Sequence, residues 1–154
     1  MRNRTIGTIG ILKSIGQAPK SLMIIASGTF GNDFKGMDLL YSSGRVEFDG
    51  YAFDTDSIMW DTGASETCVY AKDKDFHIES GQGEDRLFYA ANGDVVKGKQ
   101  YQGTITLFNG LKISGEFPVM YAEQPVADVV IGMNVISNGK FTVDGRSKTF
   151  TFET

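Results

Sequence analysis

The sequence of 154 residues has few of the residue types that build disulfide or metal frameworks. It contains one cysteine and one histidine, which excludes an internal disulfide framework and the usual zinc sites made of cysteine and histidine. It also contains no run of eighteen apolar residues, so no segment is long enough to cross a membrane as a helix. Small disulfide-rich folds, zinc modules and helical membrane proteins are therefore excluded.

The sequence also lacks an excess of positive charge. Fifteen Lys and Arg residues stand against nineteen Asp and Glu residues, giving a net charge of −4, and the basic residues form no cluster. This balance argues against a nucleic-acid partner, because phosphate binding needs a concentrated basic surface. With 41% apolar and 22% charged residues, the chain is too apolar to be disordered, and its length suits one domain.

The N-terminal part differs in character from the rest. Arg2 and Arg4 resemble the start of a signal peptide, but glycines and lysines interrupt the following segment, and the apolar run over Leu22–Ala26 is too short. We therefore expect a soluble, cytoplasmic protein without a membrane partner. We divide the chain into an N-terminal extension of uncertain order over residues 1–43 and a folded domain over residues 44–154.

Glycine is abundant, with nineteen residues, and it recurs after Asn or Asp between short apolar segments. These dipeptides are typical of type I′ hairpin turns, in which both central residues take a positive φ. Four of them occur in about a hundred residues, which predicts a mostly β domain. The four are Asp49-Gly50, Asn92-Gly93, Asn109-Gly110 and Asp144-Gly145.

Two segments near the C-terminus predict specific elements. Residues Lys148–Glu153 alternate between polar and apolar, which predicts a strand that buries Phe150 and Phe152. The segment Met133–Asn138 is followed by Gly139, which indicates a short helix that ends at a glycine.

The segment most informative about function runs from Ser57 to Val69. An apolar strand, Ile-Met-Trp, leads into Asp61, and the chain then turns through Thr62, Gly63, Ala64 and Ser65. Taken alone, Asp-Thr-Gly is typical of a turn that caps a strand. A carboxylate at the end of a buried strand is nevertheless held on a rigid element, as acid–base chemistry requires.

In its extended form, Asp-Thr-Gly-Ala-Ser after an apolar strand resembles the active-site signature of aspartic proteases, most closely that of the retroviral type, the retropepsins. A second element, Asp128–Ile136, resembles the apolar-Gly segment that precedes a short helix in that family. The resemblance extends over residues 44–154 and implies a closed, retropepsin-like β-barrel with one short C-terminal helix, assembled as a two-fold homodimer.

The resemblance assigns roles to individual residues. It implies that Asp61 is the catalytic carboxylate, that Thr62, Gly63, Ser65 and Gly132 support the active-site loop, and that Ala91, Asn92 and Gly93 form the tip of a flap. It also implies that Lys148–Glu153 is an interface strand. No metal and no organic cofactor are implied, so we expect neither.

Only one Asp-Thr-Gly occurs in the chain, whereas this chemistry needs two carboxylates that share a proton. The second carboxylate must then come from Asp61 of another copy, which predicts an isologous homodimer. The predicted function is an aspartic endopeptidase that binds its peptide or protein substrate in an extended form.

Two alternatives remain open at this point. One is a non-catalytic dimer that binds peptides with the same fold, and the other is a structural β-barrel in which Asp61 only caps a strand. A cysteine protease is disfavoured, because Cys68 is expected to be a buried small hydrophobic residue and His77 a solvated loop residue.

Overall fold

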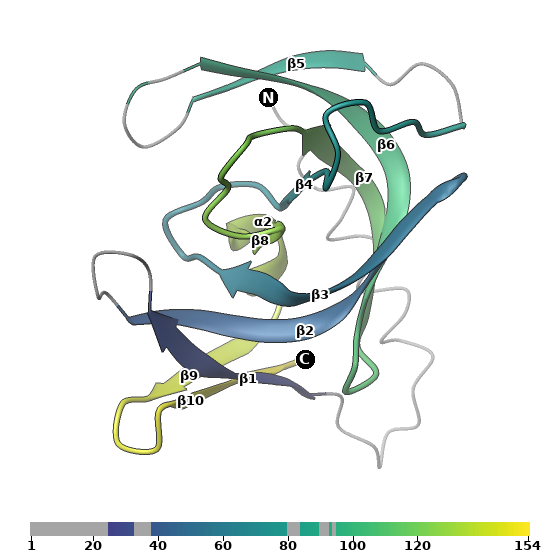
Figure 1. The fold of residues 1–154 in the computed structure, drawn as a ribbon. Coiled ribbons are helices and arrows are strands. Elements are labelled where there is room, and N and C mark those ends of the chain that lie inside the picture. The colour runs from purple at the N-terminus through teal and green to yellow at the C-terminus, as the bar shows by residue number, and fades with distance from the viewer. Residues whose placement is uncertain (1–24, 33–37, 80–83, 90–92, 94) are drawn as a thin grey trace.

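The computed structural model describes residues 25–32, 38–79, 84–89, 93 and 95–154, which form ten strands and one short helix (Figure 1). The strands are β1 (Ile25–Asn32), β2 (Asp38–Phe48), β3 (Tyr51–Trp60), β4 (Cys68–Tyr70), β5 (Glu84–Tyr89), β6 (Val95–Leu107), β7 (Lys112–Met120), β8 (Val129–Ile131), β9 (Lys140–Asp144) and β10 (Thr149–Glu153). Helix α2 (Met133–Ile136) follows β8. No helix in the described ranges is long and apolar enough to span a membrane.

The ten strands form one sheet, which closes on itself to make a barrel. Their order is β5-β6-β7-β4-β8-β3-β2-β1-β10-β9, and β6 also pairs with β2. In this extra pairing Gly103–Leu107 lies antiparallel to Gly44–Phe48, so six strands from β6 to β2 close the barrel. The predicted mostly β, closed barrel with one short C-terminal helix is confirmed.

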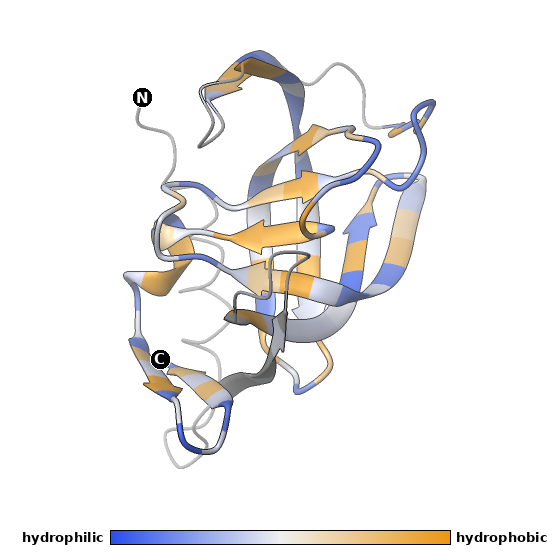
Figure 2. Cartoon of the chain, turned by 60° about the vertical axis from the view of Figure 1, so that its left-hand side comes forward, coloured by the Kyte–Doolittle hydropathy of each residue, from blue (hydrophilic) through white to orange (hydrophobic). Residues whose placement is uncertain are grey.

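The core lies inside this barrel. Along β6, residues such as Ile105 and Leu107 are buried while their neighbours are partly exposed, as expected for a strand with one face inward. Strand β8 is buried at all three positions, because it lies between β3 and β4 and runs parallel to β3. Figure 2 shows the hydrophobic residues concentrated on the strands and the hydrophilic ones mostly in the connections.

The strands outside the barrel pack against it through aromatic rings. The Trp60 ring lies 5.7 Å from that of Phe141 and nearly parallel to it, and 5.2 Å from that of Phe152. Phe150 and Phe152 of β10 are both buried, so the predicted alternating strand is confirmed. This cluster connects the β9–β10 hairpin to the strand that carries Asp61.

The prediction that β10 is an available interface strand is wrong. Strand β10 has β9 on one side and β1 on the other, both antiparallel and within the same chain. Its backbone hydrogen-bonding groups are therefore used within the protomer.

Strand β1 and residues 38–43 of β2 belong to the segment assigned from the sequence to an N-terminal extension, and both pair within the sheet.

The hairpins lie where glycine predicted them, but the turns at Gly50, Gly110 and Gly145 are not type I′, and Asn92 of the fourth predicted turn lies outside the described residues. Gly50, Gly93 and Gly110 have positive φ, whereas Lys148 is the one non-glycine residue with positive φ in the described ranges. Asp49 and Asn109 therefore keep negative φ, and only the glycine of each pair takes the left-handed conformation.

Two of these turns show how the structure departs from type I′. At the β6–β7 connection, the Gly110 N–H donates to Leu107 O and the Leu107 N–H to Leu111 O, which is typical of a type I turn followed by a glycine bulge. The β9–β10 loop spans four residues, and Asp144 Oδ1 accepts hydrogen bonds from the backbone N–H groups of Arg146 and Ser147. This side-chain contact replaces the turn that Asp144-Gly145 predicted.

Candidate active site

Asp61 lies directly beyond β3, where the strand ends between its neighbours. The last residues of β3 pair in parallel with Val129–Ile131 of β8, and Ile58 and Trp60 are buried in the core. The Asp61 N–H donates to Ile131 O at 2.9 Å. The backbone of this half-buried residue is therefore held by the most buried part of the sheet.

The turn after Asp61 holds one oxygen of its carboxylate. The Gly63 N–H donates to Asp61 Oδ1 at 2.8 Å, and the Ala64 N–H donates to Asp61 O at 3.2 Å. A Cβ on Gly63 would lie 3.1 Å from Asp61 Oδ1, so glycine lets the backbone approach the carboxylate closely. Among the described residues Asp61 Oδ2 accepts no hydrogen bond, which leaves that oxygen available for chemistry.

Helix α2 supports this loop from behind. Its first N–H groups, those of Met133 and Asn134, donate to the carbonyl oxygens of Ala64 and Ser65 at 2.8 and 3.2 Å. Gly132 permits this contact, because a Cβ there would lie 2.6 Å from the backbone carbonyl carbon and oxygen of Glu66. The loop and the start of the helix are therefore packed backbone against backbone.

The buried Thr67 stabilises the contact between the loop and the start of α2 through hydrogen bonds. The Thr67 hydroxyl and the Thr67 N–H both donate to Asn134 Oδ1, at 2.8 and 2.9 Å, and Thr67 Oγ1 accepts from the Gly132 N–H at 3.0 Å. Sequence reasoning did not select Thr67 or Asn134. They lie 67 positions apart, and no local pattern relates them.

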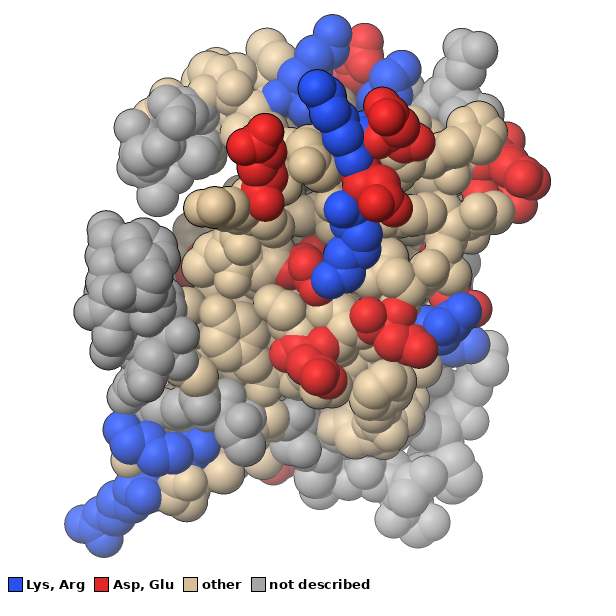
Figure 3. All heavy atoms as spheres, in the orientation of Figure 1, with Lys and Arg blue, Asp and Glu red and all other residues tan. Residues whose placement is uncertain are grey.

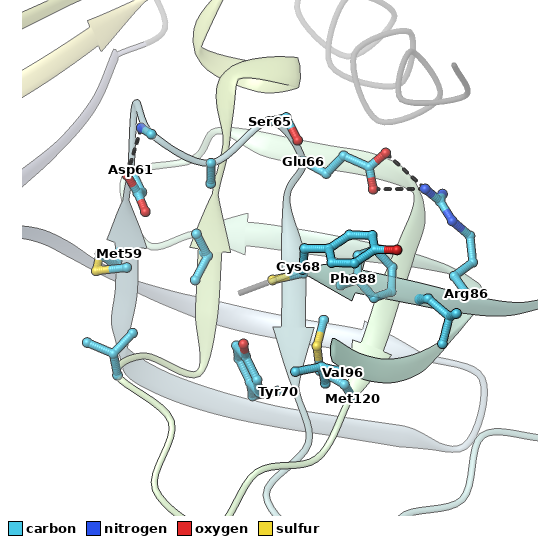
Figure 4. Close-up of a pocket in the computed structure, with 16 residues that line it drawn as sticks. Met59, Asp61, Ser65, Glu66, Cys68, Tyr70, Arg86, Phe88, Val96 and Met120 are labelled. Atoms are coloured by element: carbon cyan, nitrogen blue, oxygen red, sulfur yellow. Dashed lines mark hydrogen bonds and ion pairs between the residues drawn. The ribbon is translucent and has the colours of Figure 1, made fainter. Parts of the chain in front are cut away.

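Asp61 lines a cavity of about 590 Å³ (Figure 4). The cavity lies between the active-site loop, strand β4 and the β5–β6 hairpin, and most of its lining side chains are apolar. The lining residues are Met59, Asp61, Gly63, Ala64, Ser65, Glu66, Cys68, Tyr70, Arg86, Leu87, Phe88, Tyr89, Val96, Met120, Val126 and Val130. A mostly apolar cavity with a few polar groups at its wall, here Asp61, Ser65 and the paired Glu66 and Arg86, is the usual form of a ligand site.

An ion pair connects the hairpin to the loop across one wall of this cavity. Arg86 Nη2 of β5 lies 3.1 Å from Glu66 Oε1, and both side chains are largely buried (Figure 4). Arg86 also donates to Gln100 Oε1 at 2.9 Å, and its guanidinium lies 5.3 Å from the centre of the Phe88 ring. An acidic residue beside a glycine turn would be expected to face solvent, but the Glu66 side chain is only 17% exposed.

The other residues selected from the sequence are distributed around this cavity. Thr62 and Gly63 are exposed at the turn, and the exposed Ser65 lines the cavity. Gly93 is exposed, with a φ of 89° and open space around its Cα. Ala91 and Asn92 lie outside the described residues.

The titratable side chains near Asp61 do not support thiol chemistry. Burial raises the pKa of the Cys68 thiol to about 12, so the thiol remains protonated and weakly nucleophilic at neutral pH. Burial also raises the pKa of Tyr70. His77 is exposed. Within the described ranges no three His, Cys, Asp or Glu residues are grouped as a metal site would require.

Surface charge gives no sign of a different site on the face shown in Figure 3. Lys and Arg side chains there alternate with Asp and Glu over the upper part of the molecule. Among the described residues, the exposed ion pairs include Lys99 with Asp85 and Arg45 with Asp54. Asp61 and its cavity therefore remain the best candidate for a functional site.

Comparison with solved structures places the fold beside a known enzyme. The chain is similar to a retropepsin-like aspartic protease from Rickettsia conorii, with a TM-score of 0.51 and 16% sequence identity, over 86% of this chain and 93% of that chain. No protein-family model matches the sequence, and no curated protein matches it. At this identity the likeness shows a shared fold.

Proposed function

We propose that this protein is an aspartic endopeptidase that is active as a homodimer, with Asp61 of each protomer supplying one carboxylate. The observation that carries the proposal is the position of Asp61, which stands on a rigid loop at the wall of an apolar cavity in a retropepsin-like barrel. The aspartic protease to which the fold is similar supports the same reaction class.

The chemistry assigns a role to each of the two carboxylates. One accepts a proton from the attacking water, while the other donates a proton to the carbonyl oxygen of the peptide bond. Two carboxylates about 3 Å apart do not both ionise readily, so the pair holds one proton over a useful pH range. The Gly63 N–H, which donates to Asp61 Oδ1, orients each carboxylate for this exchange.

The cavity favours an extended polypeptide as substrate. It is bounded by the β5–β6 hairpin, which we propose acts as the flap, and Gly93 lies at its turn. Closure of a hairpin over the carboxylates excludes water and strengthens their electrostatic effect. The exposed Thr62 is available to brace the partner's loop, and Ser65 and Gly132 support the loop within the protomer. We assign Ala91 and Asn92 to the flap tip.

The test is the substitution Asp61→Asn, measured as cleavage of a peptide library by the purified protein. Because Asn supplies no carboxylate, we expect kcat/KM to fall by at least about a hundredfold. Asp56→Asn is the matched control, since Asp56 is an exposed carboxylate on the same strand. Cleavage by Asp61→Asn at the wild-type rate would falsify the proposal.

The same assay separates the alternative functions. A non-catalytic peptide-binding dimer would bind library peptides without cleaving them, and Asp61→Asn would leave that binding unchanged. A structural barrel would neither bind nor cleave them.

A further inference from the structure

Strand β9 has one side that is not paired within the described protomer. The strand lies at the end of the sheet, where β10 is its one partner in the described residues, and four of its five residues are exposed. Such an edge presents backbone N–H and C=O groups that readily pair with another chain. The opposite end of the sheet, β5, contributes to the cavity and is not available in the same way.

The sequence of β9 is complementary to itself when two copies run antiparallel. With Thr142 opposite Thr142 of a second copy, Lys140 lies opposite the partner's Asp144, and Phe141 lies opposite the partner's Val143. Opposite charges and apolar pairs directly across two strands both stabilise an antiparallel pair. All five residues find a suitable partner in this one register, and Lys140 forms no ion pair within the described protomer.

The apolar side of β9 also continues the core that supports Asp61. Phe141 stacks on Trp60 with ring centres 5.7 Å apart, and Trp60 directly precedes Asp61. Val143 lies on the same face of β9 but is 48% exposed. A second copy paired along β9 would cover it with the partner's Phe141, because facing residues of an antiparallel pair share one side of the sheet.

We propose that β9 is the dimer interface strand, pairing antiparallel with β9 of a second copy about a two-fold axis at Thr142. The inference rests on the proposed function in one respect, namely that Asp61 requires a second carboxylate from a partner. The resulting sheet runs without interruption from β1 of one protomer to β1 of the other. This pairing takes the place of the β10 interface, which the chain itself occupies with β1 and β9.

The register is tested by cross-linking with a short bis-maleimide. In Thr142→Cys the two introduced thiols face each other across the axis, so we expect a covalent dimer as the main product. In Arg146→Cys, the matched control in the loop beyond β9, the thiols of a correctly paired dimer would lie beyond opposite ends of the paired strands, and cross-linking should be minor. Even the two Asp144 residues would be about 13 Å apart along the strands, at about 3.3 Å per residue. The wild-type protein should remain uncross-linked, because Cys68 is partly buried at the cavity wall and its raised pKa keeps the thiol protonated and slow to react.

The charge pairing is tested by sedimentation. Lys140→Glu places an acid opposite the partner's Asp144 at both ends of the paired strands, so we expect the dimer dissociation constant to rise by about tenfold. Arg146→Glu makes the same charge change beyond the end of β9 and should leave the constant near that of wild type.

Cross-linking and sedimentation test the β9 interface independently of catalysis. Failure of Thr142→Cys to cross-link, or a Lys140→Glu dimer as tight as that of Arg146→Glu, would overturn the β9 interface. Peptide cleavage that depends on Asp61 would still support the proposed function in that case. Conversely, efficient cross-linking of Thr142→Cys, together with no peptide cleavage by the wild-type protein, would support the interface and contradict the endopeptidase.

Discussion

At Gly132 the backbone has no space for a side chain. The residue precedes α2 at the point where the helix meets the active-site loop, and a Cβ would lie 2.6 Å from backbone atoms of Glu66 and 2.9 Å from Ala64 O. Backbone atoms of a loop that is hydrogen-bonded to the helix move less readily than a flexible side chain. The position of Asp61 therefore depends on the absence of a side chain at a residue that lies 71 positions later in the sequence.

We predict that Gly132→Ala destabilises the protein by about 1–3 kcal/mol, because the added methyl overpacks the contact between loop and helix. Urea unfolding measures the change. Gly145→Ala is the control, since a Cβ there meets no atom within 4 Å and its φ is not positive. Equal unfolding midpoints for the two variants would contradict this account of Gly132.

At the scale of elements, the β5–β6 hairpin is connected to the active-site loop through few side chains. β5 pairs with β6 alone among the described strands, and the Arg86–Glu66 ion pair crosses from the hairpin to the loop. Because both side chains are largely buried, this pair is screened less by water than the exposed pairs of Asp85 with Lys97 and Lys99. The Arg86–Glu66 ion pair therefore couples the position of the hairpin to the shape of the cavity, which both residues line.

We predict that Arg86→Met loosens the hairpin. The substitution keeps an apolar stem but removes the Arg86–Glu66 ion pair that joins the hairpin to the loop, so the β5 amide hydrogens should exchange about tenfold faster or more. Hydrogen exchange read by mass spectrometry provides the measurement. Lys97→Met removes a cation from an exposed pair of the same hairpin and should change the exchange little; comparable acceleration in both variants would argue against a special role for the Arg86–Glu66 pair.

At the scale of the whole molecule, each protomer places one Asp61 at the cavity, where the second carboxylate, that of Glu66, is ion-paired with Arg86, and the proposed chemistry needs two copies of Asp61. Association of two protomers must then precede catalysis. The C-terminal strand, which the family resemblance assigned to the interface, has no free edge, because β10 is enclosed by β1 and β9. The need for a second Asp61 therefore does not by itself identify the surface through which two protomers associate.

We predict that the specific activity falls on dilution and follows the fraction of dimer. Initial cleavage rates over a range of protein concentrations, compared with sedimentation velocity at the same concentrations, measure this directly. Specific activity that stays constant where the protein sediments as a monomer would show that one protomer suffices, and the shared dyad would then be wrong.

Local features were predictable from the sequence because they depend on local sterics and alternation. Glycine tolerates positive φ, so the hairpins at Gly50 and Gly110 were placed correctly, and alternation placed Phe150 and Phe152 on the buried face of β10. The apolar strand before Asp61 was likewise visible. The type of turn was not predictable. Asp49 and Asn109 keep negative φ, and dipeptides of Asp or Asn followed by glycine occur in several turn types.

Strand order and the contacts around Asp61 were decided by the tertiary structure alone. The three residues of β4 become a strand because β7 and β8 lie on either side of them, and Thr67 meets Asn134 because Gly132 lets the loop and helix touch. The same holds for Arg86 and Glu66, whose pairing needs the hairpin to fold over the loop. A sequence specifies which face of each strand is apolar, but which strands become neighbours depends on how all of those faces are buried together.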